Sequence, residues 1–360
     1  MDMMPPVPVL STLYIYLTKG CNCACSHCWF VAERASQGPK HGAMLKVDTL
    51  RRAIEQALPL GLASLKWTGG EPTLHPQFPE LLQIQKEFGL SAAVETNGML
   101  VTRALAEQMK AADVFQVSVS LDSADEVVHD TIRGVKGGFK QTVKGIQELV
   151  SAGFQPELIL TLQRVNYKGL VRFFTLAEDL GAGSVKLNVL QPVLRGEKLL
   201  LEGESLSVRE ILGISEAIEN KFIKNTSLTI HLDLPMAFRP LAKILSGEKA
   251  GVCKILNILG VLPHGEYALC GVGQHVPELA MGNVMTTSLQ KVWSSHPVLQ
   301  QIREGLPEHL QGICSQCLMK SACFGSCVAA NYQLSGNLLA PYWFCEQADA
   351  EELFPNSRRT

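Results

Sequence analysis

Residues 13–28 read LYIYLTKGCNCACSHC and set a pattern that the first half of the chain repeats. The opening run of five apolar and aromatic residues predicts a β-strand. A polar loop follows, in which Cys21, Cys25 and Cys28 have the spacing C-x3-C-x2-C. We therefore expect a strand that leads directly into a ligand-binding loop.

Strand-like apolar runs alternate with amphipathic helical stretches over this half of the sequence. Strands are predicted at residues 13–17, 64–67, 92–95, 114–121, 158–162 and 185–190, and helices at 47–58, 102–112, 139–152 and 170–180. Six strands, each followed by a helix, predict a parallel α/β architecture. The periodicity alone does not distinguish an open wound sheet from a barrel.

Loops that follow the carboxyl ends of strands hold the ligands of both kinds of α/β fold. Five such segments contain unusual residues, at 18–28, 68–72, 96–98, from 122 onward and at 188–191. We therefore expect the functional site where these segments meet.

The charge balance and the cysteine content limit the classes of function. The 360 residues include 32 basic and 34 acidic side chains, so no global field favours nucleic acid or an anionic membrane. No signal-peptide pattern and no stretch of about 18 apolar residues is present, which predicts a soluble, cytoplasmic protein. In that compartment, eleven cysteines indicate metal binding rather than disulfides.

The alternation fades after about residue 235, where seven of the cysteines appear among glycines and prolines. We place a domain boundary within residues 234–240, which contain two prolines typical of a linker. The sequence thus predicts two domains, residues 1–235 and 236–360.

Three thiolates on one short loop match the ligands of a [4Fe-4S] cluster whose fourth iron stays open to another ligand. A zinc site is the competing interpretation, but structural zinc takes four ligands, so Cys23 or His27 would have to join. A third interpretation, functionless buried cysteines, does not suit four cysteines in one polar loop. We keep that interpretation for Cys23 alone, because it lies outside the spacing.

The loop C-x3-C-x-H-C-W after a first strand resembles the signature of the radical S-adenosylmethionine superfamily. Residues 67–72, WTGGEP, resemble that family's GGE segment, which binds the amino group of the methionine moiety. Gly69 and Gly70 would permit close backbone approach to this ligand, and Glu71 would accept from its ammonium. The resemblance covers residues 11–200 and implies a partial (β/α)6 TIM-like barrel.

Further segments match the same family in order. The tetrapeptide ETNG resembles its TNG turn and places Asn97 at the cofactor site. The run VSVSLD resembles its fourth strand, which puts forward Ser120 and Asp122 as sugar or carboxylate contacts. Arg133 resembles the arginine that meets the methionine carboxylate, a pairing that its fork geometry suits. The fifth strand lacks the glycines often seen there, so the adenine contacts stay unassigned.

The seven downstream cysteines include the run C-x2-C-x5-C, which zinc knuckles also use. With Gly265 five residues before Cys270, however, the whole pattern resembles the SPASM extension of radical enzymes. This resemblance implies two auxiliary [4Fe-4S] clusters, and so three with the first loop. One would be held by Cys314, Cys317, Cys323 and Cys345. The other would be held by Cys253, Cys270 and Cys327, with a fourth iron that is open or bound by an unidentified residue.

The resemblance implies reductive cleavage of S-adenosylmethionine to a 5′-deoxyadenosyl radical, fed by a one-electron donor such as flavodoxin or ferredoxin. Enzymes with this extension mostly modify ribosomally made peptides, so we expect a crosslink, a thioether or a backbone excision in a peptide. About ten residues precede the first strand, too few for a winged-helix recognition domain. The leader peptide would then be bound by the core enzyme or by a separate recognition protein.

Three alternatives remain open. The substrate could be a small-molecule cofactor precursor of porphyrin or quinone type. Sulfatase maturation is disfavoured, because residues 254–259 lack an additional cysteine and Gly271 stands where that group has an aspartate base. From a different class, the chain could be a non-catalytic zinc or iron–sulfur scaffold.

Overall fold

The structure is a computed structural model, and it describes residues 7–30, 33–34, 43–223, 226–245 and 253–360. Ten of its strands form one sheet, in the order β12-β11-β10-β1-β4-β5-β6-β7-β8-β9. These strands are β1 (Thr12–Tyr16), β4 (Ser64–Thr68), β5 (Ser91–Thr96), β6 (Val114–Ser120), β7 (Glu157–Leu162), β8 (Ser184–Val189), β9 (Thr229–Leu232), β10 (Ile258–Val261), β11 (Glu266–Ala268) and β12 (Ala280–Asn283). A separate pair is formed by β2 (Gly20–Cys21) and β3 (Glu33–Arg34).

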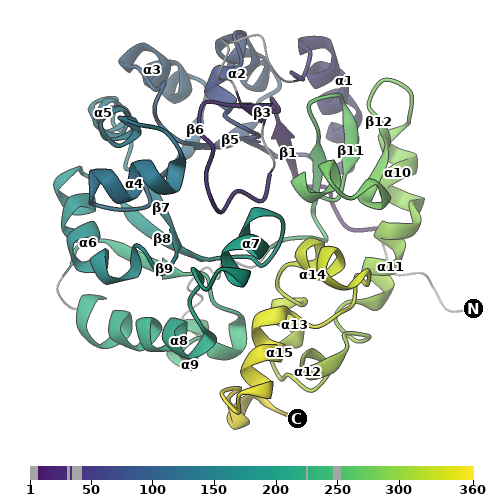
Figure 1. The fold of residues 1–360 in the computed structure, drawn as a ribbon. Coiled ribbons are helices and arrows are strands. Elements are labelled where there is room, and N and C mark those ends of the chain that lie inside the picture. The colour runs from purple at the N-terminus through teal and green to yellow at the C-terminus, as the bar shows by residue number, and fades with distance from the viewer. Residues whose placement is uncertain (1–6, 31–32, 35–42, 224–225, 246–252) are drawn as a thin grey trace, which may run out of the picture.

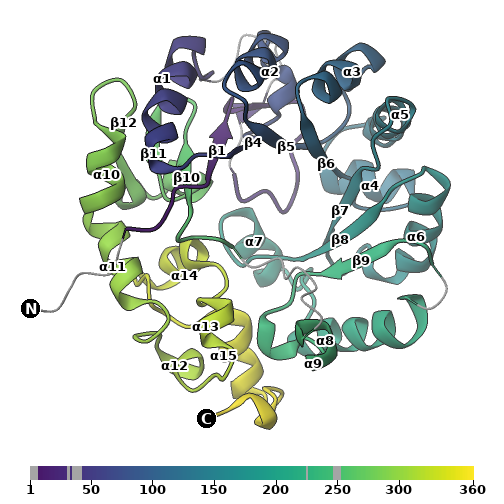
Figure 2. The same cartoon turned by 180° about the vertical axis from the view of Figure 1, so that it is seen from behind.

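The six predicted strands are β1 and β4 to β8, and they are consecutive, parallel neighbours in the sheet. The sheet curves around a central space, and the dark purple segment after β1 crosses that space in both views (Figures 1 and 2). In the order above, β12 and β9 are the two edges and are not neighbours. The sheet is therefore a partial barrel, which confirms the predicted α/β fold class.

Helices flank the curved sheet, most of them on its outside, and α7 lies near the centre in both views (Figures 1 and 2). In the barrel region they are α1 (Val47–Ala57), α2 (Phe78–Glu87), α3 (Arg103–Ala111), α4 (Glu126–Arg133), α5 (Gly138–Ser151), α6 (Leu170–Asp179), α7 (Arg195–Leu201), α8 (Val208–Ala217) and α9 (Leu241–Leu245). The later helices are α10 (Leu289–Ser295), α11 (Pro297–Gly305), α12 (Gly312–Ser315), α13 (Lys320–Cys323), α14 (Val328–Ser335) and α15 (Trp343–Ala350). In the described residues, no helix is long and apolar enough to cross a membrane.

The four predicted helices are α1, α3, α5 and α6, each within one residue of the expected bounds. Helix α4 was not predicted, although its end signals are in the sequence. Asp125 caps it by accepting from Val127 N at 2.9 Å and Val128 N at 3.1 Å, and Gly134 ends it at φ +64°. This short helix matters because its last residue is Arg133.

The residues after the predicted boundary add three strands to the same sheet. Strand β10 pairs in parallel with β1, and β11 and β12 follow as antiparallel neighbours. Helices α12 to α15 then gather next to the C-terminus (Figure 1). The division into residues 1–235 and 236–360 stays a prediction, since one sheet contains strands from both parts.

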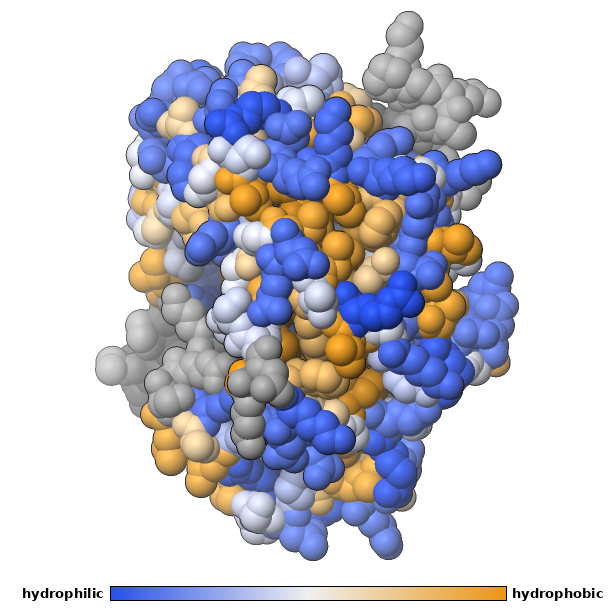
Figure 3. Space-filling model, turned by 90° about the vertical axis from the view of Figure 1, so that its left-hand side faces the viewer, coloured by the Kyte–Doolittle hydropathy of each residue, from blue (hydrophilic) through white to orange (hydrophobic). Residues whose placement is uncertain are grey.

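The packing between sheet and helices is mostly apolar, but one buried amide joins three strand regions. Trp67 of β4 is fully buried, and its indole N–H donates to Gln85 Oε1 of α2 at 2.8 Å. Gln85 Nε2 donates in turn to Leu90 O at 3.1 Å and Ala112 O at 2.6 Å, before β5 and β6. Outside, hydrophilic residues surround apolar ones on the side that faces left in Figure 1 (Figure 3).

Replacing Gln85 by Leu should lower the free energy of unfolding by about 3 kcal/mol. The change leaves the Trp67 indole N–H and two backbone carbonyls buried without partners, at ~1–3 kcal/mol each before relaxation. Urea denaturation measures the loss. Gln83→Leu on the exposed face of the same helix is the matched control and should stay within about 0.5 kcal/mol of wild type. Equal losses in both variants would contradict this role of Gln85.

Candidate active site

The first cysteine loop brings its thiols together in the centre of the barrel. Cys21, Cys23 and Cys25 are buried side by side, and Cys28 packs against them. Two N–H groups point at sulfur: Cys23 N donates to Cys21 Sγ at 3.3 Å and Arg133 Nη1 donates to Cys25 Sγ at 3.5 Å. A buried, all-thiol donor set with N–H groups directed at sulfur fits an iron–sulfur cluster.

The protonation of these thiols is uneven. Cys23 hydrogen-bonds to Cys25, and this contact, with the charges of Arg133 and His27, holds the pKa of Cys25 well below its usual value. Burial raises the pKa of Cys28 to about 11. Cys23, which the spacing sets apart, thus lies inside the group. The Cys25 thiolate is the form of cysteine that binds metal.

The two glycines after β4 are required by the contact between two backbone segments. Gly70 N donates to Thr18 O at 2.7 Å, and Glu71 N donates to Gly20 O at 2.9 Å. A Cβ at Gly70 would lie 2.1 Å from Gly20 O, and Gly69 has φ +136°. In the structure these glycines allow a close approach to the start of the cysteine loop, and their approach to a ligand stays a prediction.

The Glu71 carboxylate joins the turns that follow β4 and β5. It is 1% exposed and accepts from Thr73 N, Thr73 Oγ1, Thr96 Oγ1 and Asn97 N, at 2.6–3.1 Å. Burial raises its pKa, and these hydrogen bonds oppose the rise. We predicted that Glu71 accepts from a ligand ammonium. In the structure both of its oxygens accept from the protein, which positions the turns, and the contact with a ligand ammonium stays a prediction.

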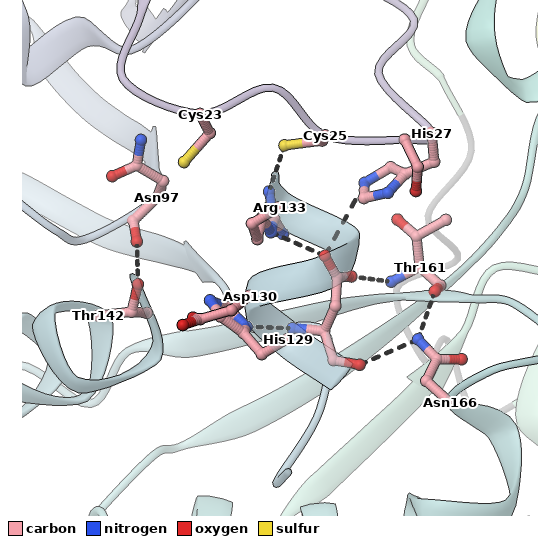
Figure 4. Close-up of polar contacts among 12 residues, drawn as sticks. Cys23, Cys25, His27, Asn97, His129, Asp130, Arg133, Thr142, Thr161 and Asn166 are labelled. Atoms are coloured by element: carbon pink, nitrogen blue, oxygen red, sulfur yellow. Dashed lines mark hydrogen bonds and ion pairs between the residues drawn. The ribbon is translucent and has the colours of Figure 1, made fainter. Parts of the chain in front are cut away.

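A buried ion pair joins β6 to helix α4 below the loop (Figure 4). Asp122 Oδ2 lies 2.7 Å from Arg133 Nε and 4.0 Å from His27 Nε2, while Oδ1 accepts from Thr161 N at 2.9 Å. Burial alone would raise the pKa of Asp122. The positive charge of Arg133, and then that of His27, lowers this pKa below its usual value.

These contacts separate the roles of residues that the sequence grouped together. Asp122 is fully buried, with Oδ1 accepting from Thr161 N and Oδ2 in an ion pair with Arg133, so it holds Arg133 in place, and its contact with the cofactor stays a prediction. Arg133 reaches Cys25, and it stays our predicted contact for the methionine carboxylate. The Ser120 side chain is half-buried and makes no hydrogen bond with a described residue, so Ser120 stays a predicted sugar contact.

Several site residues have no strong signal in the sequence. Asn22 Oδ1, in the cysteine loop, accepts from Asn97 Nδ2 at 2.6 Å. Gln163, after β7, lies 3.1 Å from His27 Nδ1 through its amide nitrogen. Asn166 Nδ2 donates to Asp122 O at 2.9 Å. Polar residues in loops after strands are the signal that could have found them.

The downstream cysteines lie in two places. A small cavity is lined by Cys314, Cys317, Cys323 and Cys345. At the other place, burial, followed by the nearby Cys327 and Cys270, raises the pKa of Cys253. In the described residues, no three His, Cys, Asp or Glu side chains are placed to hold a single metal ion. The all-thiol sets fit clusters with several irons, and their use as ligands stays our prediction.

A cavity of about 450 Å³ opens into the barrel, and we call it the lumen cavity. Its strand side is polar, and its other side includes apolar residues of the segment after β9. The charged and hydroxyl side chains along it include Lys66, Glu95, Ser118, Glu157, Lys186 and Asp233. Asp233 and Lys66 of the lining also act on the pKa of Cys253, so the second cysteine group is within electrostatic reach of this cavity.

Fold and site together define a class of protein: a partial α/β-barrel enzyme with buried, all-cysteine cluster sites. Residues 15–176 match the Radical SAM superfamily, and residues 253–318 match SPASM, an iron-sulfur cluster-binding domain. The chain therefore belongs to the radical SAM superfamily and is a radical SAM/SPASM enzyme of the oxidoreductase type. These domains imply S-adenosylmethionine and [4Fe-4S] clusters as its cofactors.

Two relatives match nearly the whole chain. The AdoMet-dependent heme synthase of Methanosarcina barkeri is 28% identical over 345 residues, which are 91% of this chain and 94% of that protein. Mycofactocin maturase MftC of Mycobacterium tuberculosis is 28% identical over 347 residues, 95% and 84% of the two chains. Streptococcus suis SuiB, bound to precursor peptide SuiA, has the same fold, with a TM-score of 0.74 at 17% identity over 94% of this chain and 76% of that one.

Gly70→Ala should prevent the first cluster from assembling, because its Cβ would collide with the backbone of the cysteine loop. Anaerobic reconstitution should then give about four fewer irons per chain than wild type, the content of one four-iron cluster. Gly213→Ala, where a Cβ meets no atom within 4 Å, is the control and should load normally. If the Gly70→Ala variant binds as much iron as wild type, the predicted effect of the collision is wrong.

Asp122→Asn should cost about 3–5 kcal/mol of unfolding free energy at neutral pH, because Arg133 stays buried without its counter-charge. The pKa of Asp122 is lowered by folding, so its contribution is complete above the unfolded value of about 3.9. The difference in unfolding free energy between wild type and Asp122→Asn should therefore shrink as the pH falls below about 3.9. Glu126→Gln, which breaks an exposed pair with Lys140, should cost about 1 kcal/mol or less.

Proposed function

We propose that this enzyme cleaves S-adenosylmethionine reductively at a cluster held by Cys21, Cys25 and Cys28, and modifies a ribosomally synthesised peptide. The modification would be a crosslink, a thioether or a backbone excision. Two auxiliary clusters, held by the two downstream cysteine sets, would bring the total to three. A separate leader-recognition protein and a flavodoxin-type or ferredoxin-type electron donor would complete the system.

The observation that carries the peptide proposal is the likeness to mycofactocin maturase MftC along 95% of this chain. The lumen cavity agrees with it. Its strand side has side chains of both charges: Lys66 is paired with Glu95, and Lys186 and Glu157 are also in the lining. Such a wall suits the amides and charged groups of a peptide better than the apolar face of a macrocycle.

A second candidate rests on an equally specific observation. The AdoMet-dependent heme synthase matches this chain at the same identity and over 94% of its own length. A porphyrin-type substrate is therefore the alternative, and the same lumen cavity would have to receive it. The two candidates share the radical chemistry and differ only in the substrate.

The residues of the chain would supply binding, orientation and exclusion of water. When bound, S-adenosylmethionine and its cluster supply the 5′-deoxyadenosyl radical that takes a hydrogen atom from the substrate. Arg133 would hold the methionine carboxylate, with Asp122 fixing the guanidinium from behind. Glu71 keeps the turns after β4 and β5 in place. The enclosed lumen limits the routes by which a radical could be quenched.

The test incubates the anaerobically reconstituted, reduced enzyme with S-adenosylmethionine and the precursor peptide encoded beside its gene. We expect 5′-deoxyadenosine together with a changed peptide mass, both read by mass spectrometry. The variant with Ala at Cys21, Cys25 and Cys28 should form neither product. An unchanged peptide mass despite 5′-deoxyadenosine formation would speak against a peptide substrate, and a porphyrin precursor is then tried in its place.

Iron and sulfide analysis of the same preparation tests the cluster count. About twelve irons per chain are expected for three four-iron clusters. Ala variants of Cys314, Cys317, Cys323 and Cys345 should each lower the count by up to about four irons. Bound zinc without visible absorbance would contradict the iron–sulfur proposal as a whole.

A further inference from the structure

Strand β8 presents two polar side chains to the inside of the barrel. Along this strand, buried residues alternate with half-buried ones, and Lys186 and Asn188 are half-buried members of the same face. Lys186 lines the lumen cavity. In a strand, residues two apart share a face, so Asn188 stands next to Lys186 on the inner side.

The strand register places Lys186 level with the predicted cofactor site. Ser120 pairs with Ile159 of β7, and Ile159 pairs with Lys186 of β8. Neighbouring strands are about 4.8 Å apart, so the backbones of Ser120 and Lys186 are roughly 10 Å apart across the curved sheet. A group bound by Lys186 would thus lie within one small-molecule length of the ribose contact that we predict at Ser120.

Other basic side chains that line the lumen cavity already have acceptors. Lys66 lies 2.6 Å from Glu95, Lys243 lies 2.7 Å from Glu219, and Arg239 Nε donates to Leu234 O at 2.9 Å. The Lys186 side chain, by contrast, forms no ion pair or hydrogen bond with any residue that the structure describes. Its charge therefore stays available to a ligand in the cavity.

Asn188 supplies a second, independent observation. Its Oδ1 atom is buried and has no hydrogen-bond partner in the described structure. Buried amide oxygens are normally paired, and an unpaired one on the strand face that carries the cavity-lining Lys186 indicates a missing donor. The side chain can donate through Nδ2 and accept through Oδ1, so it can bond both to a carboxylate and to an adjoining N–H.

We propose that Lys186 and Asn188 form the substrate anchor of the lumen cavity, in which the Lys186 ammonium pairs with a carboxylate of the substrate. The proposal rests on the proposed function in one respect, that the substrate enters this cavity. The chemistry is common to both candidate substrates, since a peptide has terminal or side-chain carboxylates and a porphyrin precursor has propionates. Asn188 binds beside the carboxylate and fixes its orientation.

A purely structural use of Lys186 makes a different prediction. Its charge helps to lower the pKa of Glu95, after the larger effect of Lys66, so it could serve only to balance that carboxylate. Loss of the lysine would then change stability but not the dependence of binding on the charge of the ligand. A thermodynamic cycle that removes the charge of Lys186, the charge of the ligand, or both distinguishes ligand binding from a purely structural role.

The experiment measures dissociation constants of the reconstituted holoenzyme for two pairs of probes. One pair is the precursor peptide and the same peptide with all carboxylates converted to methyl esters. The other pair is coproporphyrin III and its tetramethyl ester. Wild type should prefer the free acid of one pair by about tenfold to a hundredfold, as expected for a hydrogen-bonded ion pair in a cavity.

Lys186→Met should abolish that preference, and Lys186→Arg should retain most of it. Lys186→Gln replaces the Met variant if that variant does not fold. Asn188→Ala should weaken both members of the preferred pair. Lys140→Met removes an exposed charge on α5, 75% exposed, and should leave the preference as in wild type.

The outcomes separate this proposal from the proposed function. If wild type prefers the free acid over the ester only for the porphyrin pair, and Lys186→Met loses this preference, the anchor is supported and the peptide substrate is overturned. A preference in the peptide pair that is lost in Lys186→Met supports both. If Lys186→Met still prefers the free acid, the anchor is overturned. The anchor is also overturned if wild type shows no preference for the free acid in either pair.

Discussion

The contact between the backbone at Gly70 and the start of the cysteine loop is the constraint on which the site depends. With no side chain at Gly70, two N–H groups of one segment reach the carbonyls of Thr18 and Gly20. That contact fixes where the loop leaves β1, and so where its thiols lie above the parallel strands. Glu71 extends the same constraint to the next turn, because its carboxylate collects donors from Thr96 and Asn97. Backbone geometry thus orders the site before any cofactor binds.

Charge is distributed in the barrel in two different ways. Next to the cysteine loop, the pair of Asp122 and Arg133 is buried and complete, which suits a group that must stay in one position beside the cluster. Deeper in the lumen, Lys66 and Glu95 are paired, but Lys186 is not. Charges removed from water are stable when paired, so a half-buried, unpaired lysine on a cavity wall can bind an anionic group of a ligand. The barrel therefore combines a region of paired charge next to the cysteine loop with a cavity that has an unpaired charge.

The two relatives that match most of the chain carry names that point to different substrates. A shared carboxylate anchor would explain how one barrel design serves both. Lys66 and Asp233 line the cavity and also act on the pKa of Cys253, so the second cysteine group is within electrostatic reach of the same lumen.

Local sequence patterns were sufficient to predict most strands and helices of the barrel and the first cysteine loop. Apolar residues recur every second position in a strand and every 3.6 residues in an amphipathic helix, so strands β4 to β8 and helices α3, α5 and α6 could be predicted from the sequence. The cysteine spacing is local too, which is why the loop at Cys21 to Cys28 was found. The pairing of β10 with β1 was not, because it joins segments more than two hundred residues apart whose contact leaves no periodic signal. The protein contacts of Glu71 and Asp122 could not be read from the sequence for the same reason: their donors, Asn97 after β5 and Thr161 in β7, come from other parts of the chain. Whether a polar side chain faces a ligand or another part of the protein depends on partners that only folding brings within hydrogen-bond distance.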